Sequence, residues 1–226
     1  MCPFCAGSAA LIVSSVFSGG GLAAVAVNKM RSKSKKKGAV MRLVDSILME
    51  IDQEAQTTKR VLDRIPEDKL AWKPHPKSFS LGQLALHIAS VPGSVAAAAV
   101  PDTMEAPSFS QPEPKSRQEV LETFSKSLES AKDALKKMDD ARLTSTWSLT
   151  KKGKVLMSIP RIAFIRSVLM NHNYPHRGQL SVYLRMLDVP VPSIYGPSAD
   201  ENPFICFLEN LVDYPNQRRE HGRSNE

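Results

Sequence analysis

Two histidines stand four residues apart in the stretch Asn171-His172-Asn173-Tyr174-Pro175-His176-Arg177-Gly178-Gln179-Leu180. On a helix this spacing places both imidazoles on one face, one turn apart. Histidine is the commonest protein ligand of transition metals, and a pair at this spacing can supply two ligands from one helix. A metal site then requires a third ligand from another part of the chain.

Apolar residues at helical spacing flank the pair on both sides. They run from Ile159 to Met170 upstream and continue at Leu180, Leu184 and Leu187 downstream. This pattern predicts a buried helix face that the two histidines interrupt. Because a buried imidazole is costly without a partner, either a metal ion or a set of hydrogen bonds must satisfy them.

Four long helical patterns cover most of the chain after residue 40. They lie at about residues 41–65, 81–100 and 116–138, and the last carries the histidine pair and ends near Asp188. Strand signals are almost absent, so the sequence predicts an all-α fold, a four-helix bundle with connections long enough for topologies other than simple up-and-down. Ser80 is the predicted N-cap of the second helix.

Two connectors interrupt these patterns. The segment between Val100 and Ser116 is polar and rich in proline, and we expect it to cross one end of the bundle as a lid over a site. The segment at 147–154 contains a turn at Gly153 and is typical of a short irregular connector or a hairpin.

A third histidine lies on the second predicted helix. In helical bundles, sites are built from side chains of facing helices, so His87 can meet His172 and His176. Three imidazoles from two helices leave the remaining coordination positions open to water or substrate, as in catalytic metal sites. Neutral imidazoles suit Zn, Ni, Fe or Co.

The residues around these histidines resemble the DinB/YfiT-like superfamily of metal-binding four-helix bundles. The resemblance covers about residues 41–202 and rests on three blocks: Ser80-Leu81-Gly82-Gln83-Leu84-Ala85-Leu86-His87-Ile88; Asn171-His172 with His176-Arg177-Gly178-Gln179-Leu180-Ser181-Val182-Tyr183-Leu184-Arg185; and Val189-Pro190-Val191-Pro192-Ser193-Ile194-Tyr195-Gly196-Pro197-Ser198-Ala199-Asp200-Glu201. It implies a divalent metal ion (Zn, Ni or Fe) held by His87, His172 and His176, often in a homodimer. Characterised members include thiol-dependent transferases and isomerases that use low-molecular-weight thiols, and many others have no assigned reaction.

The second block departs from the family pattern at two positions. Members often read Asn-His-Glu-x-His-His-Arg-Gly-Gln, whereas this chain has Asn173 at the glutamate position and Pro175 at the first of the adjacent histidines. Loss of the glutamate removes a carboxylate that could orient a ligand or transfer a proton. Proline lacks an N–H and disfavours helical geometry in the residue before it, so we expect a kink or a helix start here that displaces His172.

The first 40 residues differ in composition from the rest. Residues 6–28 carry no ionisable side chain, and as a helix they would span about 34 Å, enough to cross a bilayer. Because six basic residues follow at 29–37 and none precede, the positive-inside rule predicts an N-terminus outside and a cytoplasmic main domain. A cleaved signal peptide fits less well. A start of the folded protein at Met41, after a fused extension, is the other interpretation of this segment.

The charge pattern argues against nucleic-acid binding. Residues 1–40 contain no acidic residue, and their six basic residues account for all but +1 of the net charge of +7. Basic character is therefore local to residues 1–40 and does not extend over the domain. The predicted organisation is a candidate anchor with a basic linker (1–40), a DinB-like bundle (41–202) and a C-terminal tail (203–226).

The sequence leaves two functions open. The preferred one is a metal-dependent enzyme of the thiol-dependent transferase or hydrolase type, acting on a small-molecule substrate, with no protein general base identified. The alternative is a non-catalytic metal-binding or stress-associated bundle tethered to the membrane, which the missing carboxylate favours; a fourth ligand such as His75 would support it. Arg177, beside the ligands, is either a helix-surface residue or a group that binds an anionic substrate.

Overall fold

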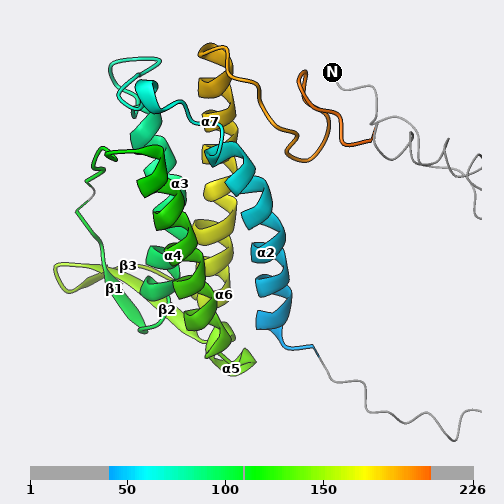
Figure 1. Ribbon diagram of the computed structural model, residues 1–226. Coiled ribbons are helices and arrows are strands. Elements are labelled where there is room, and N and C mark those ends of the chain that lie inside the picture. Colours follow the sequence, from blue (N-terminus) through cyan, green and yellow to red (C-terminus); the bar gives the residue numbers. More distant parts are fainter. Residues whose placement is uncertain (1–40, 109, 205–226) are drawn as a thin grey trace, which may run out of the picture. The chain divides into compact units, whose positions relative to one another are not determined.

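The protein is described by a computed structural model, which places residues 41–108 and 110–204 (Figure 1). Four helical columns run side by side: α2 (Leu43–Leu62), α3 (Leu81–Ala98), α4 (Arg117–Lys136), and a last column that ends in α7 (Asn173–Met186). A short 3-10 turn lies at Glu67–Lys69, and a short helix, α5 (Asp140–Thr144), follows α4. The predicted four helices are therefore present.

The bundle does not have simple up-and-down topology, because α3 and α4 both begin at one end. Pro114, just before α4, lies against Gly82 in the first turn of α3. At the same end Arg117 donates a hydrogen bond to the carbonyl of Ile65, just after α2, at 3.3 Å. The segment between α3 and α4 thus runs along the side of the bundle (Figure 1). The prediction that it crosses one end of the bundle is therefore wrong.

The helix starts follow from local capping chemistry. Ser80 Oγ accepts a hydrogen bond from the backbone N of Gln83 at 3.0 Å, and Gln83 Oε1 accepts one from the backbone N of Ser80 at 3.1 Å. This reciprocal capping box satisfies two backbone donors at the start of α3. Ser116 caps α4 by accepting from the backbone N of Glu119 at 3.1 Å. The N-cap predicted at Ser80 is confirmed.

The last column is three segments instead of one uniform helix. α6 (Arg161–Phe164) continues into the π-helical segment η2 (Ile165–Asn171), and α7 follows. The π register is seen where the backbone N of His172 donates to the carbonyl of Ser167, five residues back, at 3.1 Å. Pro175 falls in the first turn of α7, directly after the π-helical segment, so the residue that lacks an N–H lies where the helical register changes. The helix start predicted near Pro175 is thus present.

A small sheet covers the end of the bundle near α5, so the all-α prediction is wrong in this detail. β1 (Thr103–Glu105) pairs in parallel with β2 (Thr146–Lys151), which pairs antiparallel with β3 (Lys154–Pro160). The β2–β3 hairpin turns at Lys152 and Gly153, both with positive φ (51° and 74°), as two-residue hairpins require. The hairpin alternative for residues 147–154 is confirmed. The strand β1 was not predicted, because the sequence of these three residues does not distinguish a strand from a loop.

Two clusters of buried apolar residues fill the bundle. One lies towards the sheet, where the Trp147 ring stacks on Phe164 with centroids 3.8 Å apart and its Nε1 donates to the carbonyl of Ala98 at 3.0 Å. The other joins the start of α3 to α7 through residues such as Leu84 and Leu180. These clusters fix α3 against the last column, and the three histidines lie on those two elements.

The predicted membrane anchor at residues 6–28 lies outside the described residues. Among those described, α3 alone is long and apolar enough to span a bilayer. Since 67% of its residues are buried inside the bundle, it is the core helix of this domain.

Candidate metal centre

His87, His172 and His176 form one group between α3 and the last column. One ring nitrogen from each lies within 4.8 Å of the other two, and the described residues contain no other such group of histidine, cysteine and carboxylate side chains. The rings stand nearly perpendicular to one another, with centroids 4.5 to 5.3 Å apart. Pro175 has therefore not displaced His172 from the other two histidines.

Two of the ring nitrogens lie at hydrogen-bonding distance from each other. Nε2 of His172 lies 2.8 Å from Nε2 of His176. Metal–nitrogen bonds of 2.0–2.1 Å at tetrahedral angles would place two ligand nitrogens about 3.3 Å apart, so the spacing is near that of two ligands of one ion. One nitrogen from each of the three rings can therefore hold a divalent metal ion, with small adjustments of the rings.

The surroundings of His87 and His172 favour the neutral form of both imidazoles. Burial lowers the pKa of His87 to about 4, with added lowering from His176 and His172. Burial and then His176 also lower the pKa of His172, against an opposing effect of the Val168 backbone. Because a metal binds the neutral imidazole, both groups are ready to coordinate at neutral pH without losing a proton.

Two glutamines orient the histidines from outside the group. Gln179 Oε1 lies 2.8 Å from Nδ1 of His176. Since a carboxamide oxygen can only accept, Nδ1 carries the hydrogen, and the lone pair of Nε2 points into the group. Gln111, whose backbone carbonyl accepts from Gln83 at 3.0 Å, makes a side-chain hydrogen bond with His87. The loop predicted as a lid therefore contacts a histidine of the site.

No acidic residue takes the place of the missing glutamate. Asn173 occupies that position, and its Oδ1 is buried without a hydrogen-bond partner, as is Nδ1 of His172. The described group contains three histidines and no carboxylate. His75 is not a fourth ligand, because it is exposed and its Nδ1 accepts from the backbone N of Lys77 at 3.1 Å.

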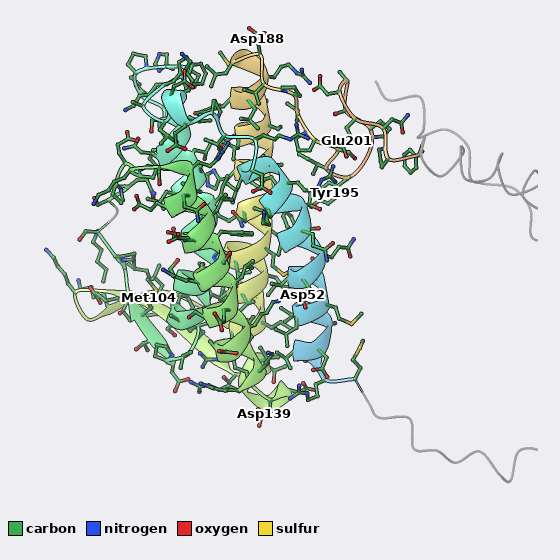
Figure 2. The ribbon with its side chains drawn as sticks, viewed as in Figure 1. Asp52, Met104, Asp139, Asp188, Tyr195 and Glu201 are labelled. Carbon is green, nitrogen blue, oxygen red and sulfur yellow. The ribbon has the colours of Figure 1, made fainter. Side chains whose placement is uncertain are left out.

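Arg177 is buried and is not a helix-surface residue. Its side chain is 2% exposed and forms an ion pair with Glu54 Oε2 at 2.7 Å. It also donates to Thr58 Oγ1 at 3.0 Å and to the hydroxyl of Tyr195 at 2.5 Å, and the guanidinium lies over the Tyr195 ring. Arg177 thus fastens α7 to α2 and to the segment after α7, which carries Tyr195 (Figure 2). The prediction of a helix-surface residue is wrong, and the binding of an anionic substrate group stays a prediction.

Sequence reasoning missed Glu54, Gln111 and the Glu50–Tyr174 hydrogen bond of 3.0 Å that lies beside the Arg177 network. Each contacts a residue more than 20 positions away, so no local spacing marks it. A surface depression of about 830 Å³ lies between α4 and α5, and none of the three histidines lines it. We therefore assign the site from its donor atoms and not from the size of a cavity.

Comparisons with known proteins agree with this fold. The DinB family model matches residues 33–204. The chain is 24% identical to the uncharacterised protein YrdA of Bacillus subtilis over 162 residues, which is 72% of this chain and 93% of YrdA. A crystal structure of a DinB-like protein from Bacillus cereus has a similar fold, with a TM-score of 0.56, 24% identity, and coverage of 67% of this chain and 97% of that one. Since the family match spans most of the residues described above, the chain belongs to the DinB family.

Proposed function

We propose that this protein is a divalent-metal-dependent enzyme of the thiol-dependent transferase or hydrolase type, with His87, His172 and His176 as metal ligands. The observation that carries the proposal is the convergence of three imidazoles, with ring nitrogens within 4.8 Å of one another. A divalent ion bound there would supply Lewis acidity, which lowers the pKa of a water or a thiol enough to make a nucleophile at neutral pH.

Three features support a catalytic over a structural site. The described residues supply three ligands and no fourth, whereas structural zinc sites are closed by four protein ligands. His172 and His176 are only partly buried, so a small molecule can approach from their side. Gln111 lies on a loop beside His87, where its movement would alter access to the site.

The chain itself provides positioning and no carboxylate base. Gln179 fixes the His176 ring, and Gln83 holds the loop that brings Gln111 to His87. With Asn173 at the glutamate position, the proton that a nucleophile loses must pass to solvent or to the substrate. This favours a thiol as the nucleophile, because its pKa is far lower than that of water and a metal alone can ionise it.

The second candidate function is non-catalytic metal binding in a stress-associated bundle, and the buried amide of Asn173 favours it. Both candidates keep the same proposed setting: a homodimer with its main domain in the cytoplasm, attached to a membrane through residues 6–28. A low-molecular-weight thiol and a small electrophile are the proposed substrates of the enzyme.

Metal content of the full-length chain tests the site. Elemental analysis should give close to one ion per chain for the wild type and almost none for His172→Ala, while His75→Ala, which removes a histidine outside the group, should match the wild type. Absence of metal from the wild type after incubation with Zn, Ni and Fe salts would reject both functions.

Activity then separates the two functions. The metal-loaded wild type should consume thiol with a small electrophile, or hydrolyse an activated ester, at a rate that falls with His172→Ala and not with His75→Ala. Stoichiometric metal that raises the melting temperature, without either activity, would favour the non-catalytic bundle.

A further inference from the structure

The tip of the β2–β3 hairpin carries a cluster of basic side chains that the fold leaves unpaired. Lys151, Lys152 and Lys154 are all exposed. Within the described residues, none of their ammonium groups lies within 4.0 Å of a carboxylate. The neighbouring acid, Glu105, accepts hydrogen bonds from the backbone N of Lys152 at 2.6 Å and from the Thr150 hydroxyl at 2.8 Å. The tip is therefore a local patch of positive charge.

Three consecutive apolar side chains follow the lysines and are also exposed. Val155 is 62% exposed, Leu156 57% and Met157 39%. A half-buried strand alternates between inward and outward residues, but here Thr150 pairs with Val155 and Leu149 with Met157, so Leu156 is the extra residue of a β-bulge. The bulge breaks the alternation, and the edge strand β3 presents all three side chains to the surroundings.

The hairpin extends from the end of the bundle at which α2 begins. The first residue of α2, Leu43, donates its backbone N–H to Asp140 in α5 at 2.9 Å. β2 begins at Thr146, two residues after α5 ends (Figure 1).

We propose that the hairpin tip, residues 151–157, docks on an anionic lipid surface. The lysines would lie among the lipid headgroups, with Val155, Leu156 and Met157 in the boundary between headgroups and acyl chains. Basic and aliphatic side chains side by side are the combination that anionic membranes bind. Nucleic acid would leave the aliphatic residues without a partner, and pairing of β3 between two copies would leave the lysines without counter-charges.

A fluorescent probe on the hairpin tests this in the full-length chain. Cys2, Cys5 and Cys206 are changed to serine, and Leu156→Cys is labelled with an environment-sensitive dye. A second chain carries the dye at Lys77→Cys, an exposed position before α3 at the other end of the bundle. Vesicles of phosphatidylcholine, with or without phosphatidylserine, are then titrated into each protein. Residues 1–40 are present in every variant, so differences between variants report the hairpin.

The dye at position 156 should shift to shorter wavelength with anionic vesicles, while the dye at position 77 should not. Each lysine contributes about fivefold to anionic-lipid affinity, so Lys151→Gln/Lys152→Gln/Lys154→Gln should weaken binding on the order of 100-fold. A matched variant, Lys69→Gln/Lys73→Gln/Lys115→Gln, removes the same charge at the other end and should bind like the parent.

Four results would overturn the proposal. They are no shift at position 156, an equal shift at position 77, equal binding by the hairpin variant, and a shift as large with phosphatidylcholine alone. If the dye at position 156 shifts without vesicles when the protein concentration is raised, the partner of strand β3 is a second copy of the chain. If the dye shifts only when duplex DNA is added, the partner is nucleic acid. Thermal unfolding of each variant shows that it is folded before its titration is interpreted.

Discussion

Nε2 of His172 lies 2.8 Å from Nε2 of His176, one helical turn away, across the boundary between η2 and α7. The four-residue spacing brings both side chains to one face of the helical segment, with Pro175 inside the first turn of α7. The two rings therefore face the same point beside His87.

The metal-free protein should lose stability as the pH falls from about 6.5 to about 4. Burial lowers the pKa of His87 from 6.5 to about 4, so over this range the unfolded chain binds a proton there that the folded chain does not. This contribution of His87 to stability is complete above its pKa in the unfolded chain, 6.5, and is lost as the pH falls to its pKa in the folded protein, about 4. Urea unfolding in the presence of a chelator measures it. His87→Leu should flatten this dependence and His75→Gln should not; equal slopes in wild type and His87→Leu would contradict the assignment.

Gln179→Leu should lower metal affinity by about 10- to 100-fold without abolishing binding, because the His176 ring loses the acceptor that fixes its orientation. Competition with a chromophoric chelator measures the change. Gln118→Leu is the matched control, since Gln118 bonds only to Glu122 on the exposed face of α4. Unchanged affinity in Gln179→Leu would show that Gln179 does not orient the ligand.

Glu54→Ala should destabilise the protein by about 3 kcal/mol, because it leaves the buried charge of Arg177 without its ion-pair partner. Glu129→Ala removes an exposed carboxylate on α4 and should change stability by less than about 0.5 kcal/mol. Chemical denaturation compares the two. Metal content should be unchanged in Glu54→Ala; wild-type stability with weaker substrate binding would instead support a substrate role for Arg177.

Gly82→Ala should destabilise the protein by about 1–3 kcal/mol, because a Cβ there would lie 2.9 Å from Pro114 and force the loop away from α3. The same loop carries Gln111, whose side-chain hydrogen bond raises the pKa of His87. The pKa of His87 should therefore also change in Gly82→Ala, and an NMR titration of the His87 ring measures it. Gly178→Ala is the control, since a Cβ at that helical position meets nothing within 4 Å, and it should be neutral or stabilise by up to about 1 kcal/mol. Equal stability of the two variants would show that the loop is not held at Gly82.

Local patterns in the sequence determined the helices, their caps and the histidine pair. Residues up to four positions apart are placed by the 3.6-residue period of the helix. The apolar spacing, the N-cap at Ser80 and the shared face of His172 and His176 could therefore be predicted before any packing was known. The hairpin at 147–154 was likewise one of two open alternatives, because its turn residues are local. The third ligand, His87, followed from bundle architecture and from the resemblance to a family.

Only the tertiary structure decided which distant groups meet. The pairs Glu54 with Arg177, Gln111 with His87 and β1 with β2 join segments that are 20 or more residues apart, and no local period encodes such contacts. These contacts depend on how α2, α3 and the last column pack, and on the path that the segment between α3 and α4 takes along the bundle. The sequence by itself therefore determined that two histidines share a helix face, whereas packing decided that they face His87, that Arg177 is buried against Glu54, and that no carboxylate joins the site.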